Sequence, residues 1–80
     1  MYYIATFYSH FGAIRFKREG KGKIGDVRLM PVPRSLSSSC GTCVRFRCEE
    51  GYVPAPDPYG EIEQIVKETR DGYEQIFHAK

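Results

Sequence analysis

The cysteines are the residues of this 80-residue chain whose types and spacing predict chemistry. Cys40 follows the serine run Ser37–Ser39 and precedes Gly41, and Cys43 completes a Cys-x-x-Cys pattern. The thiolate form of a cysteine is the nucleophile in thiol chemistry, and nearby cations or free backbone N–H groups favour that form. We therefore expect the reactive centre at Cys40, with Cys43 as a second candidate.

Two arginines and the backbone of the loop are the candidates for stabilising an anion at Cys40. Arg34 and Arg45 carry fixed positive charges, and Ser37–Ser39 can present hydroxyls and amides to an anion such as a persulfide. Gly41 allows another backbone or a bulky sulfur to approach closely. A serine-rich stretch is also common in surface loops that have no role beyond flexibility.

The Cys-x-x-Cys pattern has three interpretations: a redox pair, half of a metal site, or coincidence. A disulfide needs Cα atoms about 4.4–6.8 Å apart, whereas three residues of extended chain span roughly 10 Å. The pair can close only if Gly41 bends the chain before the next strand.

A metal site needs about four ligands, and the chain offers that number only if distant segments converge. We expect no metal and no cofactor, Cys48 as a partly buried small side chain at a strand end, and His10 as a solvent-facing residue at a helix start. The five potential ligands are Cys40, Cys43, Cys48, His10 and His78.

The length and charge of the chain limit its class. Residues 1–80 are enough for a single domain, and an odd number of cysteines is atypical of a secreted disulfide framework. The net charge of +2 is small, and Glu19 interrupts the basic run Arg15–Lys23, so we do not expect nucleic-acid binding. The absence of a signal-like or membrane-spanning run predicts a cytoplasmic protein without membrane contact.

The first half of the sequence predicts a strand, a helix and a second strand. Tyr2–Tyr8 is apolar on both parities, as in a central strand. Ser9 is a cap for a helix from about His10, whose core-facing stripe would be Phe11, Ile14 and the stem of Arg18, with Gly12 and Ala13 allowing close packing. The turn Gly20–Gly25 and the strand Asp26–Val32 follow.

The second half predicts a strand, a helix and a strand around two loops. The loop Pro33–Gly41 leads to the alternating strand Thr42–Arg47, and a long loop, Cys48–Pro58, follows. Asp57 would cap a helix beginning at Pro58. Its buried face would comprise Ile62, Ile65, Val66 and Thr69, with Glu63, Lys67 and Glu68 in water. Asp71-Gly72 would end this helix before the strand Tyr73–His78.

This element order predicts an α+β fold of the ferredoxin-like split βαββαβ type, an antiparallel sheet with two helices on one face. The run Pro31–Gly41, followed by Val44-Arg45-Phe46, resembles the DUF3343 family of selenium/sulfur carrier-like proteins. The resemblance implies that Cys40 is the carrier cysteine and that Arg34, Ser38, Ser39 and Gly41 are its motif neighbours. It also implies a cysteine desulfurase-like donor and a sulfur or selenium acceptor protein as partners.

Cys43 departs from the family pattern, in which a small or aliphatic residue is common at this position. It could act as a resolving thiol. Three hypotheses follow: a carrier, rather than a stand-alone enzyme, that holds a persulfide or selenosulfide on Cys40; a thiol–disulfide module that uses Cys40 and Cys43; and a non-enzymatic protein-binding module.

Overall fold

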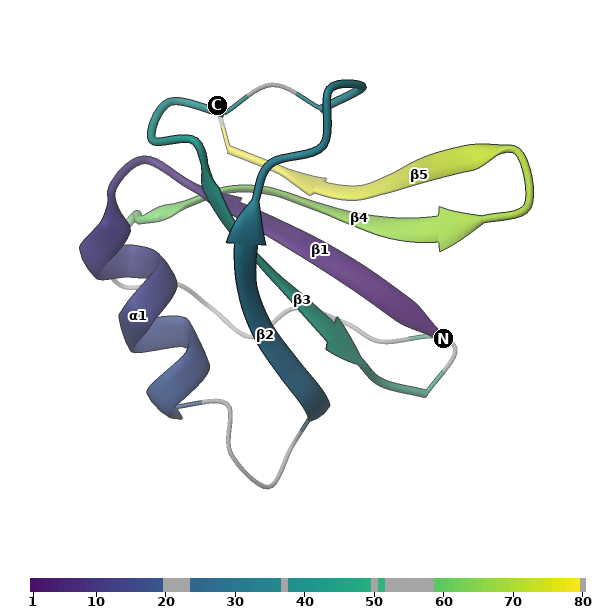
Figure 1. The fold of residues 1–80 in the computed structure, drawn as a ribbon, viewed down its shortest axis with the longest axis horizontal. Coiled ribbons are helices and arrows are strands. Elements are labelled where there is room, and N and C mark those ends of the chain that lie inside the picture. The colour runs from purple at the N-terminus through teal and green to yellow at the C-terminus, as the bar shows by residue number, and fades with distance from the viewer. Residues whose placement is uncertain (20–23, 37, 50, 52–58, 80) are drawn as a thin grey trace.

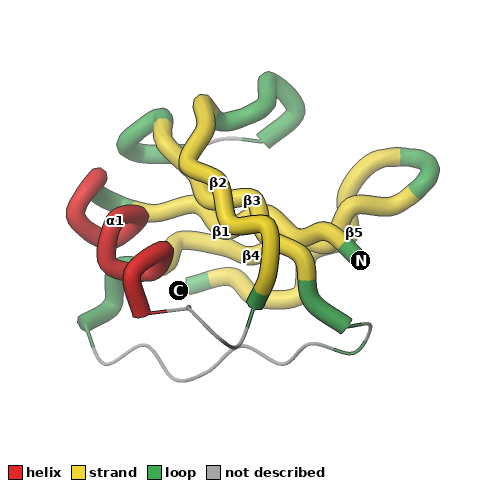
Figure 2. Tube along the Cα trace, turned by 60° about the horizontal axis from the view of Figure 1, so that its bottom comes forward, coloured by secondary structure: helices red, strands yellow, loops and turns green. Residues whose placement is uncertain are grey.

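The computed structural model describes residues 1–19, 24–36, 38–49, 51 and 59–79. In this part of the chain, one antiparallel sheet of five strands has the order β2-β3-β1-β4-β5, and one helix packs on it (Figures 1 and 2). Along the chain, the elements are β1 (Tyr2–Phe7), α1 (His10–Glu19), β2 (Gly25–Pro31), β3 (Thr42–Arg47), β4 (Ile62–Thr69) and β5 (Gly72–His78).

The central strand β1 is covered on both faces, as the apolar residues at both its odd and its even positions predict. On the face that carries α1, the core comprises Tyr3, Ala5, Phe7, Ala13, Val44, Phe46 and Ile65. On the opposite face, Ile4, Cys43 and Val66 form a second cluster. Successive side chains of a strand point to opposite faces, so β1 and β3 each contribute to both clusters.

The helix α1 begins as predicted but buries a different face. Ser9 Oγ accepts a hydrogen bond from the backbone N–H of Gly12 at 3.3 Å, which confirms the cap. The predicted core stripe is wrong, because Phe11 is 78% exposed and Ile14 is 51% exposed. Arg18, the third member of that stripe, is exposed as well.

Close approach of α1 to the sheet explains this rotation. Gly12 and Ala13 are buried, and Phe16 packs against the core. A Cβ atom on Gly12 would lie 2.9 Å from the Cβ of Glu61 and 3.2 Å from the ring of Phe7. The helix therefore meets the sheet through its smallest residues, and their opposite side faces the solvent.

The second predicted helix is wrong, because Ile62–Thr69 forms strand β4 between β1 and β5. Ile65 is buried among the residues under α1, and Val66 is buried on the other face. A strand covered on both faces shows no alternation of polar and apolar residues, and its apolar positions can match a helical spacing by chance. Asp57 and Pro58, the predicted start of this helix, lie outside the described residues.

The sequence Asp71-Gly72 marks a hairpin and not a helix end. Thr69 pairs with Gly72 across a two-residue connection, and Gly72 has a φ of 145°, which favours glycine. The α+β class and the antiparallel sheet are confirmed, whereas the predicted two-helix ferredoxin-like arrangement is not. Its first half is present, since β1 and β2 are joined through α1 and both lie antiparallel to β3 between them.

The loop at 33–36 and 38–41 passes around the end of the sheet (Figure 1), and we call it the carrier loop after the function that the sequence predicts for Cys40. Leu36 packs on the second cluster, together with Met30 and Val32 from the end of β2. Cys40, near the other end of the loop, packs instead against the core under α1. The loop therefore leaves β2 on one face of the sheet and returns to β3 beside the other.

Candidate functional site

Cys40 is partly exposed and lies at the bend that precedes β3. Its sulfur is 3.4 Å from the backbone nitrogen of Thr42, which donates a hydrogen bond, and 3.4 Å from the carbonyl oxygen of Thr42, which accepts one. A thiolate at Cys40 would keep the contact with the N–H group and lose the contact with the carbonyl. One backbone donor is therefore already directed at the sulfur.

Gly41 creates the bend that holds Cys40 in this position. Its φ of 76° lies in the left-handed region, and its carbonyl accepts a hydrogen bond from the backbone N–H of Val32 at 3.1 Å. A Cβ atom at Gly41 would meet nothing within 4 Å. The backbone conformation, and not a lack of space, is thus what favours glycine here.

The serines of the carrier loop fasten the loop to the sheet. Ser38 Oγ donates a hydrogen bond to the carbonyl of Phe7 at 3.3 Å. The backbone N–H and the hydroxyl of Ser39 both donate to the carboxylate of Glu63, at 3.2 and 3.1 Å. The amide of Ser39, a predicted anion donor, is therefore already bound to a carboxylate, while Ser37 lies outside the described residues.

Glu63 is a site residue that the sequence analysis missed, because the wrong helix assigned it to the solvent. Its contact with the carrier loop joins segments 24 residues apart in the chain. Local sequence carries no signal for such a contact, since it depends on β4 lying beside β1.

His10 is a second residue near Cys40 that the sequence could not locate there. Its ring is exposed, as predicted, and its Nδ1 atom forms a hydrogen bond with the hydroxyl of Thr42 at 2.8 Å. The same Thr42 provides the backbone N–H that contacts the Cys40 sulfur. The first residue of α1 thus braces the residue that holds the thiol.

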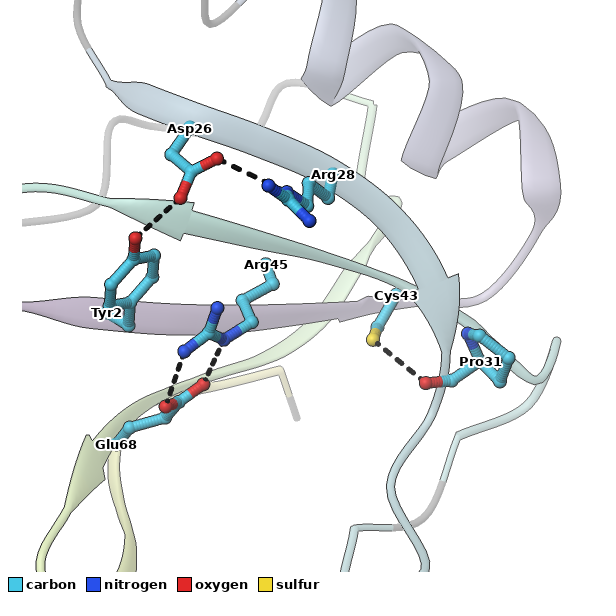
Figure 3. A network of polar contacts seen from close by, with 7 residues as sticks. All are labelled: Tyr2, Asp26, Arg28, Pro31, Cys43, Arg45 and Glu68. Carbon is cyan, nitrogen blue, oxygen red and sulfur yellow. Dashed lines mark hydrogen bonds and ion pairs between the residues drawn. The ribbon is translucent and has the colours of Figure 1, made fainter.

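Cys43 differs from Cys40 in burial and in the face that it occupies. It is fully buried in the second cluster, and its thiol donates to the carbonyl of Pro31 at 3.6 Å (Figure 3). Burial, and then the charge of Cys40, raises the pKa of Cys43 to about 11. All three cysteines are free thiols, and Cys40 packs on the other side of the sheet from Cys43.

Arg45 shares a face with Cys43, as the alternation of β3 predicts, and belongs to a polar network. Its guanidinium binds both carboxylate oxygens of Glu68, at 2.6 and 3.0 Å, and lies 3.8 Å above the ring of Tyr2 (Figure 3). This charge is therefore engaged with a carboxylate. Arg34 is exposed in the carrier loop, and no carboxylate pairs with it in the part of the chain that the structure describes.

The same network extends to the start of β2. The Tyr2 hydroxyl donates to Asp26, which also accepts a hydrogen bond from Arg28 at 3.2 Å (Figure 3). These hydrogen bonds lower the pKa of Asp26, the one from Tyr2 most strongly. Of the two arginines predicted to stabilise an anion, Arg45 is thus bound to a carboxylate, and Arg34 has no carboxylate partner among the described residues.

Cys48 lies near the opposite end of the sheet from Cys40. Its backbone N–H donates to the carbonyl of Met1 at 2.9 Å, and it lines a shallow hollow with Met1, Gly25, Arg47 and Glu49. Strand β3, which is roughly 17 Å long, lies between Cys48 and Cys40 along the chain. No group of three or more potential metal ligands occurs among the described residues.

Comparison with known proteins identified a family. Residues 2–78 match the family model described as "Putative Se/S carrier protein-like". Searches of curated proteins and of solved structures found no match. No helix in the described residues is long and apolar enough to cross a membrane.

Proposed function

Because the chain belongs to the Se/S carrier protein-like family, we propose that it carries sulfur or selenium as a persulfide or selenosulfide on Cys40. The observation that supports this most directly is the contrast between two thiols. Cys40 is partly exposed on a braced loop with a backbone donor at its sulfur, whereas Cys43 is buried and its pKa is raised. An accessible thiolate is what sulfur transfer needs.

Loading is a thiol exchange without net oxidation. The Cys40 thiolate attacks the outer sulfur of a donor persulfide, the donor S–S bond breaks, and the donor cysteine leaves as a thiolate. Cys40 then holds an S–SH group. In unloading, an acceptor thiolate attacks the outer sulfur and releases Cys40 as a thiolate, and the outer atom is selenium in the selenosulfide case.

The surroundings of Cys40 would serve both steps. The N–H group of Thr42 stabilises negative charge at the sulfur before attack and after release. Arg34 would add a positive charge to the developing anion. The contacts of Ser38 and Ser39 with Phe7 and Glu63 hold the loop in place, so the thiol is presented without first ordering the chain.

The partners in this proposal are a cysteine desulfurase-like donor and a sulfur or selenium acceptor protein. The cargo stays covalently attached to Cys40, so the protein works as a carrier and needs no enclosed substrate pocket. It also needs no cofactor of its own, because both exchanges occur between thiolates and the outer sulfur or selenium atom.

Intact-mass measurement of the reduced protein after incubation with a cysteine desulfurase and cysteine tests the proposal. We expect the wild-type protein to gain one sulfur atom and to lose it again on treatment with dithiothreitol. Cys40→Ser should gain none, while Cys43→Ser and Cys48→Ser should gain as much as the wild type. Cys48 is the matched control, because it is also partly exposed and lies at the other end of the sheet.

Three results would contradict the proposal. Full loading of Cys40→Ser would show that another residue holds the sulfur atom. Absence of any loading, with loss of two hydrogens on mild oxidation that requires both Cys40 and Cys43, would favour the thiol–disulfide module. Unchanged partner binding after replacement of all three cysteines, together with no sulfur loading of the wild type, would favour a non-enzymatic binding module.

A further inference from the structure

The outward stripe of α1 is the feature that the carrier chemistry leaves unexplained. We define it as Phe11, Ile14 and Arg18, which are spaced three and four residues apart and therefore share one side of the helix. Phe11 and Ile14 are 78% and 51% exposed, and Tyr8, just before the helix, is 44% exposed. Large apolar side chains that gather on a surface commonly mark a binding site.

The packing of α1 on the sheet does not need this stripe. The helix meets the sheet through Gly12, Ala13 and Phe16, on the other side of its axis. Figure 2 shows α1 at one edge of the molecule, and Phe11 and Ile14 are the large apolar residues that it exposes. Their exposure thus has no structural benefit within the described part of the chain.

The stripe begins next to the proposed carrier thiol. His10 directly precedes Phe11, and its ring is hydrogen-bonded to Thr42 at 2.8 Å. Thr42 in turn contacts the Cys40 sulfur through its backbone. Two successive contacts, from His10 to Thr42 and from Thr42 to Cys40, therefore connect the start of the stripe with the sulfur.

The size and charge of the stripe indicate the kind of partner. From their exposed fractions, Tyr8, Phe11 and Ile14 offer roughly 300 Å² of surface. A stable dimer needs about 800 Å² from each partner, so the area suits a short-lived complex and not a lasting pair of identical chains. Lys17 and Arg18 are exposed in the last turn beside a single acidic residue, Glu19, and the positive charge of this turn favours an acidic partner surface.

We infer that the outward stripe of α1 docks the protein that donates the persulfide, through an apolar groove with an acidic rim on that donor. The inference rests on the proposed carrier function. Docking there would bring the donor persulfide to Cys40 from the side of the helix N-terminus. The complex would separate readily after transfer, as a carrier requires.

The test compares two sources of sulfur, a purified cysteine desulfurase carrying a persulfide and inorganic polysulfide. The initial rate of Cys40 loading is measured by intact mass for the wild type and for the double variant Phe11→Ser/Ile14→Ser. We expect the variant to load about tenfold more slowly from the desulfurase, and at an unchanged rate from polysulfide, which needs no docking. Tyr73→Ser is the control, because Tyr73 is 37% exposed on β5.

A charge variant adds a second criterion. Arg18→Glu should slow loading from the desulfurase several-fold at low salt, and added salt should shrink the difference. Circular dichroism would verify that each variant folds.

Four results separate failure of the docking inference from failure of the carrier function. Wild-type loading from polysulfide but not from the desulfurase, or equal loading of the wild type and the double variant from the desulfurase, would overturn the docking inference. Slower loading of the double variant from both sources would also overturn it, since the stripe would then act on the thiol itself. Failure of the wild type to load from polysulfide would contradict the carrier function.

Discussion

Alkaline pH should destabilise the folded protein through the buried thiol of Cys43. Burial, and then the charge of Cys40, raises its pKa from 9.0 to about 11. Between these two values, the unfolded chain has lost the proton while the folded protein keeps it. The folded state binds more protons there, so the free energy of unfolding falls as the pH rises. The contribution of Cys43 is complete below about pH 9 and lost above about pH 11.

The size of the effect follows from the shift. Each pKa unit corresponds to about 1.4 kcal/mol, so a shift of this size corresponds to about 3 kcal/mol. The free energy of unfolding of a small domain is about 5–15 kcal/mol, so losing about 3 kcal/mol would remove a large share of the stability. Cys43 is fully buried, and solvent screening therefore does little to reduce this loss of stability.

Urea unfolding followed by circular dichroism, with reductant, from about pH 8 to about pH 12 would measure this loss. Other titrating groups cancel in the comparison with Cys43→Ala, which has no proton to lose and leaves a small cavity at every pH. We expect the wild type to lose about 3 kcal/mol more than Cys43→Ala over this range. Cys40→Ser should retain most of the loss, because burial is the larger cause. Parallel curves for the wild type and Cys43→Ala would refute the reasoning.

Two further predictions concern α1. Gly12→Ala should lower the free energy of unfolding, measured in urea, by about 1–3 kcal/mol, because the new Cβ would lie 2.9 Å from the Cβ of Glu61. This crowding should outweigh the higher helix propensity of alanine. Lys17→Ala, at an exposed position of the same helix, is the control, and a Gly12→Ala variant more stable than the wild type would contradict the packing. His10→Ala removes the hydrogen bond to Thr42 and should slow alkylation of Cys40 by iodoacetamide about threefold. Alkylation of Cys48 should not change, and equal slowing at both cysteines would contradict a local effect.

The strands β1 and β3 were predictable because their local patterns match their surroundings. β1 has apolar residues on both parities and is central, and β3 alternates and directs Cys43 and Val44 to opposite faces. The local pattern of β4 led to the wrong prediction. Ile65 and Val66 are adjacent residues buried on opposite faces of the sheet, and such a pair fits one face of a helix as well as a strand covered on both faces. The β-branched residues of β4 and the following Asp71-Gly72 favour a hairpin, and they indicate the structure of this segment better than the helical spacing of Ile62 and Ile65.

The buried side of α1 and the contacts that hold the carrier loop could not be predicted, because they depend on tertiary packing. Periodicity identifies the apolar side of a helix, but which side packs on the sheet was decided by the clearance at Gly12. The carrier loop itself was predicted from its serines and glycine. Its braces, Glu63 and His10, come from segments more than 20 residues away, where local sequence carries no information about contact.

The separation of Cys40 from Cys43 bears on how a carrier would keep its cargo. A persulfide on Cys40 is destroyed if a neighbouring thiolate attacks the inner sulfur, because a Cys40–Cys43 disulfide forms and hydrogen sulfide leaves. Gly41 turns the chain between the two cysteines, so Cys40 packs beside the α1 face and Cys43 lies beneath the other. The raised pKa of Cys43 also keeps it protonated at neutral pH. In the proposed carrier, Cys43 would therefore be a packed core residue whose burial protects the persulfide, and its action as a resolving thiol would require this packing to open.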